Sequence, residues 1–405
     1  MFNNQTVCLV TTKAMATSNG MMSLLVSNPF RAALPETTTP MAGSFTFTLQ
    51  PKVGEEFPQL CHRLSAELRL RGATPLHLLI FGKVTACAEL TDTLETILGR
   101  ANWPVTWVDG AACDSSPIAG IQVQAFAGDV ERIEHNGHIV GSVFTEGGAR
   151  QCFVGGLMPA DKTLSRSDQT RQTLGDLQKI LIKAGFELAD IVRTWFFLEN
   201  ILTWYDDFNR ARTNIYSGIK FRTGSLPAST GVSAKNPAGT ALALAALAFR
   251  PLEKSSRAEE VASPLQCPAP AYGSSFSRAM ELPTNTGRRL HISGTASIAP
   301  GGKTLWVGDV HKQVELTMDV VGEILRSRGF TFANLTRATA YFRRATDANV
   351  FAQWIKENRL TQIPIISAQC DICRDDLLFE LEAEAEKTEA NNRGAVTGTH
   401  SATYR

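Results

Sequence analysis

The sequence contains no hydrophobic run that approaches the roughly 18 residues needed to cross a membrane. Its first residues, MFNNQTVCLVTTKAM, lack the basic start and apolar core of a signal peptide. Charge of neither sign dominates: 40 basic residues stand against 39 acidic ones, and no basic run provides a footprint for nucleic acid. We therefore expect a cytoplasmic protein with no membrane partner and no nucleic-acid partner.

Cysteine is also scarce, and the eight cysteines lack the density of a disulfide-stabilised secreted scaffold. Two of them, Cys370 and Cys373, form a CxxC spacing in QCDICRDD. A zinc site needs two more ligands, and the sequence has no second CxxC and no HxxxH; HNGH at 135–138 is better interpreted as a turn. A thioredoxin-type pair opens a helix, whereas this pair precedes a strand pattern. We expect no metal and no cofactor here.

What the sequence does contain is a repeated order of secondary-structure patterns. The middle part has an amphipathic helix that ends at Gly185, and the last part has one that ends at Gly329. Arg193 and Arg337 each follow these glycines by eight positions. The predicted elements of the middle part are strands at 136–144 and 149–157, a helix at 167–185, a strand at 191–198, a helix at 203–219 and a strand at 241–249.

The other two parts of the chain show the same order, most weakly in the first. The first part has predicted helices at 57–72 and 90–102 and strands at 76–85 and 119–127. The last part has predicted strands at 288–298, 335–342 and 377–385 and helices at 311–329 and 348–360. Three β-α-β-α-β units predict an α+β fold in which each unit has helices on one face of a mixed sheet.

Linker-like composition sets the boundaries between the units. The turn region 128–138 and the charged, then proline-rich stretch 253–275 separate the three patterns. We therefore predict units at 1–128, 129–252 and 253–386. The end of the chain has no periodicity, so we predict a disordered tail at 387–405.

The three closing strands differ in one chemically important position. Aligned on their apolar residues, they place Gln122, Ala243 and Glu380 on equivalent faces. Only the third unit has a carboxylate there, which suits a pseudo-oligomer that retains chemistry in one of several equivalent clefts. The later glutamates of the same strand are expected to face solvent: Glu382, Glu384 and Glu386.

The middle unit resembles the Rid/YjgF superfamily in DQTRQTLGDLQKIL, AGFELADIVRTWFFL and LPASTGVSA. The resemblance implies the trimer of this superfamily, with ligand clefts between subunits, here as an intramolecular pseudo-trimer. Many members hydrolyse reactive enamines and imines. This unit departs from their pattern, with Ser229 in place of a carboxylate-binding arginine and Ala243 in place of a glutamate, so we expect it to be inactive as a deaminase.

The last third resembles the chorismatases, Rid-like enzymes that hydrolyse chorismate to dihydroxycyclohexadienoates or convert it to hydroxybenzoates. The resemblance lies in YGSSFSRA (272–279), ISGTAS (292–297) and DICRDDLLFELE (371–382). With the middle-unit motifs it covers residues 130–386. The loop that follows ISGTAS and Ile298, APGGKTLWVGDV (299–310), lacks the usual histidine–acid pair of the family, so a related cyclic carboxylate is an alternative substrate. Three units in one chain predict a monomer or a dimer of pseudo-trimers.

This resemblance implies that Glu380 is a general acid, a role that needs a raised pKa. Cys373 would shape the pocket or steer an intermediate; otherwise it is a buried small apolar residue. Arginine suits carboxylate binding, although each candidate has an ordinary ion-pair alternative: Arg278, Arg343 and Arg374. Other predicted pocket residues are Tyr272, Tyr341, Thr295, Ala296 and Ser297. The rival hypotheses are a Rid-type imine or enamine hydrolase that uses Glu380 and an arginine, and a non-catalytic small-ligand sensor or scaffold.

Overall fold

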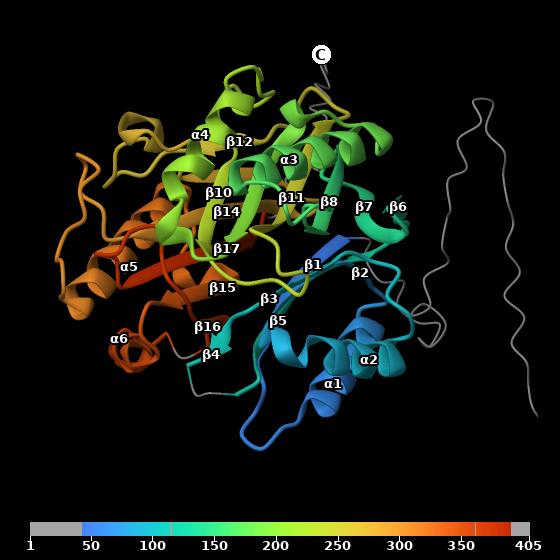
Figure 1. Ribbon diagram of the computed structural model, residues 1–405, viewed down its shortest axis with the longest axis horizontal. Coiled ribbons are helices and arrows are strands. Elements are labelled where there is room, and N and C mark those ends of the chain that lie inside the picture. The colour runs from blue at the N-terminus through green and yellow to red at the C-terminus, as the bar shows by residue number, and fades with distance from the viewer. Residues whose placement is uncertain (1–42, 114–115, 361, 390–405) are drawn as a thin grey trace, which may run out of the picture.

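The computed structural model describes residues 43–113, 116–360 and 362–389, so the predicted tail beyond 389 and residues 1–42 lie outside the described part. The chain forms three sheets, each with two helices on its outer side (Figure 1). In the described part, no helix is long and apolar enough to span a membrane. The three-unit α+β fold class is confirmed, while the unit boundaries stay a prediction.

The first sheet has the strand order β1-β5-β2-β3. Leu60, Leu64 and Leu68 recur every four residues on the first helix, and all are buried against the sheet. The elements are β1 (Gly43–Leu49), α1 (Phe57–Leu70), β2 (Thr74–Gly82), α2 (Cys87–Leu98), β3 (Val105–Val108) and β5 (Ile118–Ala127).

The second sheet has the order β10-β9-β11-β8-β7-β6. Asn136 and Gly137 have φ values of 51° and 80°, which fits the predicted tight hairpin turn. Ser165 accepts a hydrogen bond from the Asp168 amide and so caps the first helix. The elements are β6 (Glu131–His135), β7 (His138–Glu146), β8 (Ala149–Leu157), α3 (Arg166–Lys183), β9 (Ile191–Leu198), α4 (Tyr205–Tyr216), β10 (Ala228–Ser233) and β11 (Leu242–Pro251).

The third sheet has the order β12-β13-β14-β17-β15-β16-β4, and its last strand, β4 (Ala111–Ala112), comes from the first part of the chain. The closing strand extends two residues into the predicted tail. The other elements are β12 (Glu259–Val261), β13 (Ala279–Pro283), β14 (Gly287–Ala296), α5 (Val310–Ser327), β15 (Leu335–Phe342), α6 (Ala348–Glu357), β16 (Ile365–Gln369) and β17 (Phe379–Thr388).

Eight strands of the described chain were absent from the predicted pattern: β1, β3, β4, β6, β10, β12, β13 and β16. Three of these recur at equivalent places in the three units: β3, β10 and β16. Each pairs in parallel with the strand that precedes it in the chain, β2, β9 or β15. With four to six residues each, they are too short to show a clear alternating pattern. They matter because they face the neighbouring units: β3 and β10 are edge strands of their sheets, and β16 pairs with β4 from the first part of the chain.

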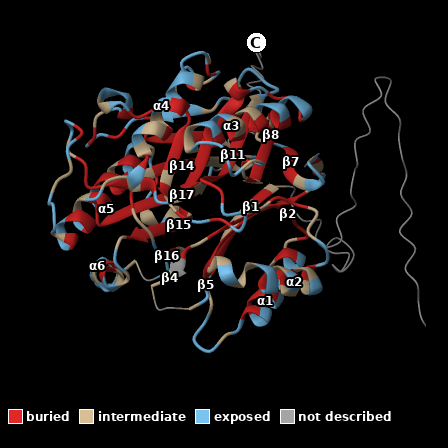
Figure 2. Cartoon of the chain, viewed as in Figure 1, coloured by how far each residue is buried: buried red, intermediate tan, exposed pale blue. Residues whose placement is uncertain are grey.

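The inner faces of all three sheets meet in one central apolar core, and the helices lie outside it (Figures 1 and 2). At its middle, Phe81 of β2 contacts both Phe197 of β9 and Tyr341 of β15, with ring centroids 6.2 Å apart in each case. Each unit therefore contributes one aromatic ring to the pseudo-threefold centre. Such aromatic contacts stabilise the packing of the three sheets.

These three rings also correct the predicted alignment of the closing strands. Tyr341 lies opposite Glu380, and Phe197 lies opposite Ala243, as the alignment requires. Phe81, however, lies opposite Gly120. The first-unit equivalent of Glu380 is therefore Gly120, two residues before the predicted Gln122. A glycine contributes no side chain to the pattern, so an alignment on apolar residues passed over it.

The expectation that the later glutamates of β17 face solvent is wrong. Glu382 and Glu384 are 1% and 2% exposed, and Glu386 is half-buried. One face of this central strand packs against α5, and the other faces the neighbouring units rather than water. An alternating strand pattern normally indicates one wet face, but packing three sheets around a common centre removes that face.

Candidate active site

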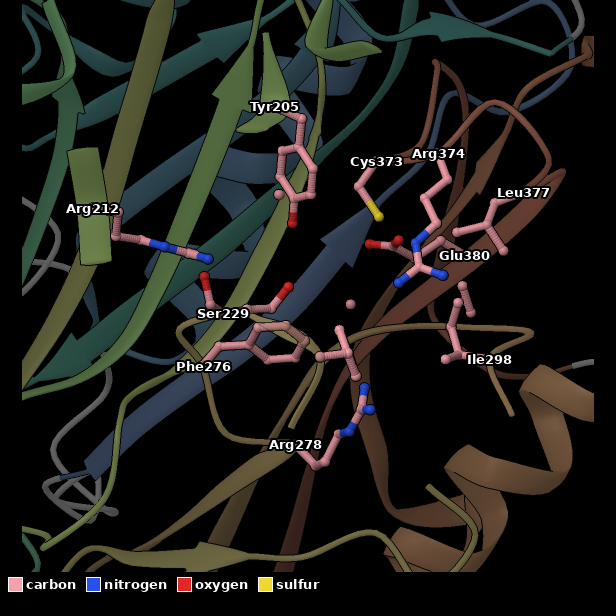
Figure 3. A pocket seen from close by; sticks show the side chains of 15 residues that line it. Tyr205, Arg212, Ser229, Phe276, Arg278, Ile298, Cys373, Arg374, Leu377 and Glu380 are labelled. Carbon is pink, nitrogen blue, oxygen red and sulfur yellow. The ribbon is translucent and has the colours of Figure 1, made fainter. Parts of the chain in front are cut away.

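A small cavity of about 50 Å³ lies between the second and third sheets (Figure 3). It opens into a wider depression of about 1050 Å³, and five residues border both spaces: Tyr205, Tyr272, Ser274, Cys373 and Arg374. Small-molecule sites usually measure about 300–1,000 Å³. The cavity and the depression together therefore provide room for a small ligand, whereas the cavity alone is only its inner end.

Main-chain contacts between β10 and the third unit form the wall of this cavity. The Ser229 amide donates to the Ser293 hydroxyl over 2.8 Å, and the Ser277 amide donates to the Pro227 carbonyl over 3.0 Å. Ser229, the position at which the middle unit departs from the Rid pattern, lines the cavity. The site is thus shared between two units.

The carboxyl group of Glu380 is the acidic group of the cavity. Its side chain is 4% exposed, and among the described residues no donor forms a hydrogen bond with it. Burial, reinforced by the nearby negative charge of Glu382 and opposed by Arg193, raises the pKa of Glu380 to about 8. At neutral pH the group is therefore mostly protonated and can donate a proton into the cavity.

Gly294 of β14 makes room for this carboxyl group. A methyl group at this position would overlap the Glu380 carboxylate oxygen and would lie 3.3 Å from Thr230. We expect Gly294→Ala to displace Glu380 and to lower turnover by about 10-fold or more, since a small misplacement of a reacting group is costly. Gly175→Ala on α3 is the control, because Gly175 does not border the cavity and its added methyl group has no close neighbour within 4 Å. Equal losses of turnover in the two variants would contradict this role of Gly294.

Arg212 of α4 is a cavity residue that the sequence interpretation missed. Its guanidinium group is 2% exposed, packs over Phe208 at 5.0 Å and donates to the Asn209 side chain over 2.8 Å. Its Nε has no hydrogen-bond partner, and it has no carboxylate partner in the described chain. The sequence pattern could have indicated that Arg212 is buried, because residues 208, 212 and 216 are spaced by four and lie on the apolar stripe of the helix.

Arg278 and Arg374 lie on the other side of the cavity, as Figure 3 shows. Arg278 is 4% exposed and donates from Nε and from the terminal amine to the Cys267 carbonyl, over 3.1 and 2.8 Å. Arg374 donates to the Gly302 carbonyl over 2.7 Å. Both guanidinium groups lie over the Tyr272 ring, at 5.5 and 5.6 Å. Among the described residues, neither forms an ion pair with a carboxylate, so the cavity is electropositive.

Cys373 lines the cavity beside Glu380, and the Tyr205 hydroxyl points toward both residues (Figure 3). Burial and the neighbouring Glu380 raise the pKa of Cys373 to about 12. The group is therefore a neutral thiol at neutral pH and not a thiolate nucleophile. Cys370 packs instead against the central core, so the two CxxC side chains lie in different apolar clusters.

The structure places four of the predicted pocket residues outside the cavity lining. Strand alternation directs Gly294 and Ala296 toward the cavity and turns Thr295 away from it. The other displaced residues have partners elsewhere: the Tyr341 hydroxyl donates to Glu382 over 3.1 Å, Ser297 donates to the Leu305 carbonyl over 3.0 Å, and Arg343 lies 3.5 Å from Asp371. Of the predicted set, the cavity brings together Tyr272, Arg278, Ala296, Cys373, Arg374 and Glu380.

Behind the cavity lies a buried network of charges centred on Glu382. Arg193 of β9 donates to one carboxylate oxygen over 2.7 Å, and Arg337 of β15 donates to the other over 2.9 Å. Three hydroxyl groups also donate to this carboxylate: Thr230, Thr339 and Tyr341. Although burial opposes ionisation, the two guanidinium groups hold the pKa of Glu382 below its usual value. Two carboxyl groups two residues apart therefore have opposite protonation states.

In the described part of the chain, no group of three or more histidine, cysteine, aspartate or glutamate side chains is placed to hold a metal ion. A protonated carboxyl group can transfer a proton, and the three arginines can bind negatively charged groups.

Comparison with known proteins gives three similarities. The family model described as "Endoribonuclease L-PSP" matches residues 149–248. Two proteins from Streptomyces hygroscopicus match over longer stretches. One, named 3-hydroxybenzoate synthase, is 26% identical over 243 residues, covering 53% of this chain and 68% of its own. The other, named chorismatase, is 24% identical over 319 residues, covering 71% of this chain and 89% of its own.

A solved structure confirms the fold. The crystal structure of a chorismatase superposes with a TM-score of 0.63 at 20% sequence identity, covering 85% of this chain and all of the chorismatase chain (100%). At this level of identity, the likeness concerns the fold. It extends over all three sheets, including the first, whose sequence pattern is the weakest.

Proposed function

We propose that this chain, which is similar to the chorismatases and other proteins of the Rid/YjgF superfamily, is an enzyme acting on chorismate or a related cyclic enol-ether dicarboxylate, releasing pyruvate. One observation carries the proposal: a buried, mostly protonated carboxyl group shares a cavity with three arginines that have no carboxylate partner in the described chain. Such a cavity suits a dianionic substrate that reacts by accepting a proton.

The arginines lie on two sides of the cavity, which suits a ligand with two carboxylates. Arg212 belongs to the second unit, whereas Arg278 and Arg374 belong to the third. In the proposed complex, one carboxylate of the substrate binds Arg212 and the other binds the opposite pair. Arginine can donate two parallel hydrogen bonds to a carboxylate, so it orients the ligand as well as attracting it.

Glu380 would donate its proton to the methylene carbon of the enol ether. The double bond supplies the electron pair for the new C–H bond, and the positive charge that results is shared with the ether oxygen. Water then adds to the adjacent carbon and loses a proton. Cleavage of the C–O bond leaves pyruvate and a ring alcohol, with a proton returned to the ether oxygen. Glu380 is reprotonated from solvent, so one water is consumed per turnover.

Relatives of this chain carry names that correspond to two outcomes, hydrolysis and formation of 3-hydroxybenzoate. Both outcomes release pyruvate, but aromatisation consumes no net water. Hydrolysis leaves a non-aromatic diol, whereas the second route leaves a hydroxybenzoate. The two products are distinguished by their ultraviolet spectra and masses.

The direct test is incubation of the purified protein with chorismate. We expect pyruvate and one ring product to appear in equal amounts, and the Glu380→Gln protein, prepared in the same way, serves as the control. Pyruvate is measured with a coupled dehydrogenase, and the ring product by chromatography and mass spectrometry. A freshly generated imine of 2-aminoacrylate type is assayed in parallel. Turnover of the imine without turnover of chorismate would contradict the proposal and favour a Rid-type deaminase.

The pH dependence of the reaction follows from the raised pKa of Glu380. A general acid must be protonated in the free enzyme, so kcat/KM is expected to be constant at neutral pH and to fall as pH rises through about 8. With the usual pKa of a glutamate, the fall would begin several pH units lower. The measurement is kcat/KM between about pH 5 and pH 10, a range that extends roughly two or more pH units to each side of the expected midpoint. A profile that rises through pH 8 would indicate that Glu380 acts as a base.

A further inference from the structure

The two neighbouring carboxyl groups of β17 have very different surroundings. Glu382 accepts hydrogen bonds from two arginines and three hydroxyl groups, and so is fully satisfied as an anion. Glu380 faces the cavity and has no hydrogen-bond partner in the described chain. Two carboxyl groups whose environments differ in this way commonly divide acid and base roles between them.

Thr230 and Gly294 form the partition between these two carboxyl groups. Thr230 donates to Glu382 over 2.6 Å and accepts from the Gly294 amide over 3.1 Å. Gly294 in turn lies directly against Glu380, with no room for a side chain. Glu382 cannot turn toward the cavity, because its oxygens are held from behind by Arg193 and Arg337.

We propose that Glu382 is a positioning residue for proton transfer: its anion, fixed by Arg193 of the second unit and Arg337 of the third, acts together with burial to keep the proton on Glu380. Two strand residues span about 7 Å, a distance at which a fixed charge in a buried site still acts strongly. The network thereby supplies a function for the second unit. That unit has lost the carboxylate of its own cleft, with Ala243 at the equivalent position, and it contributes an arginine behind the cleft of the third unit.

Burial is the largest cause of the raised pKa of Glu380, and of the charged groups around it only Glu382 acts in the same direction. The cations near it favour ionisation: Arg193, Arg212, Arg278 and Arg374. The other titratable groups near it are neutral at neutral pH, because burial raises the pKa of each: Tyr205, Tyr272, Tyr341, Cys370 and Cys373. Glu382 is therefore the negative charge that opposes ionisation of Glu380.

The inference rests on the proposed function only for the role of Glu380 as proton donor, so it is tested first without substrate. The protonated carboxyl band of Glu380 is identified by infrared difference spectroscopy as the band that Glu380→Gln removes. Its loss is then followed against pH in the wild type and in Glu382→Gln. We expect the midpoint to fall by about 1 pH unit or more in the variant, because the repelling charge is gone.

Glu384→Gln is the matched control, since it also removes a buried carboxylate that pairs with Arg337, at 3.0 Å. Glu384 is four residues from Glu380, about 14 Å along the strand, so its charge acts on Glu380 from twice the distance. We expect the midpoint in Glu384→Gln to move by less than half as much as in Glu382→Gln, a ratio that follows from distance and screening. Equal shifts in both variants, or no shift in Glu382→Gln, would overturn the proposal.

Glu382→Gln leaves two buried guanidinium groups without their shared anion, so it risks misfolding. The double variant Glu382→Gln/Arg337→Gln reduces that risk by removing one charge of each sign. Loss of the Arg337 cation offsets part of the effect of losing the Glu382 anion, so the double variant is expected to shift in the same direction by a smaller amount. Its failure to show the shift would count equally against the proposal.

Activity provides the second readout. In Glu382→Gln the falling limb of kcat/KM is expected to move to lower pH by the same amount as the infrared midpoint, and activity should recover toward wild type below that limb. Glu382→Asp retains the charge, so its limb should stay within about 0.5 pH unit of wild type. A merely structural role would lower the plateau and leave the limb in place. If the infrared midpoint shifts as expected but chorismate is not turned over, the proposed function is refuted and the role of Glu382 is not.

Discussion

Replacing Glu380 with glutamine is expected to lower kcat by roughly 100-fold or more while the protein still binds its dicarboxylate ligand. Glutamine has nearly the same shape as protonated glutamate but cannot supply a proton. The side chain is buried in the cavity beside Gly294, so the replacement preserves the packing that holds it. The effect should therefore appear in kcat, with little change in the dissociation constant. Steady-state kinetics and ligand titration by calorimetry give the two quantities separately.

The matched control for this variant is Glu386→Gln, the same substitution on the same face of β17. Glu386 is half-buried, pairs with Arg289 over 2.8 Å and does not border the cavity. We expect kcat to change by less than about threefold in this variant, as for most changes away from a site. Full activity in Glu380→Gln, or equal losses in both variants, would remove Glu380 from the mechanism.

Replacing Arg212 with alanine is expected to weaken binding of the dicarboxylate by roughly 30-fold to 1,000-fold, or about 2–4 kcal/mol. The guanidinium group is buried and has no carboxylate partner in the described chain, so a ligand carboxylate would be its missing counter-charge. The loss should appear mainly in KM and in the dissociation constant. The loss of affinity caused by Arg212→Ala should be smaller for an analogue that lacks one carboxylate.

Arg171→Ala on helix α3 provides the control, because Arg171 is exposed at the surface, pairs with Asp168 and borders neither the cavity nor the depression. An exposed ion pair contributes little, so binding should change by less than about threefold. Arg278→Ala and Arg374→Ala should weaken binding of the second carboxylate in the same way as Arg212→Ala weakens the first. A dissociation constant that is unchanged in Arg212→Ala would show that this arginine only supports the packing of Phe208 and Phe196.

Much of the cavity was predicted from two short motifs. YGSSFSRA and DICRDDLLFELE contain Tyr272, Arg278, Cys373, Arg374 and Glu380, all of which line it. Residues near such a motif were predicted less well, since adjacent strand residues point to opposite sides. Thr295 lies between the cavity residues Gly294 and Ala296 of β14 but faces away from the cavity. Strand β15, which holds Tyr341, contributes no residue to the cavity lining. The side chains from the second unit, Tyr205 and Arg212, were missed because their contribution depends on the packing of one unit against another.

Local patterns were sufficient for the elements and for the threefold repeat. Strand β9 was predicted at its observed bounds, as was β15, because runs of β-branched and aromatic residues bounded by turns leave little choice. Two of the predicted helices end at Gly185 and Gly329. Arg193 and Arg337 follow these glycines by eight positions each, so the two strands after the helices are in the same register. These are properties of short segments, in which neighbouring residues determine the backbone conformation.

Packing between distant segments determined the surroundings of the charged side chains. In the sequence, Glu380 and Glu382 are alternate residues of one strand, with nothing to distinguish a proton donor from a buried anion. They differ because β9 brings Arg193 to Glu382, while β10 and α4 enclose the space in front of Glu380. Burial and paired charges set the free energy of ionisation, and both arise only when residues about 190 positions apart come into contact.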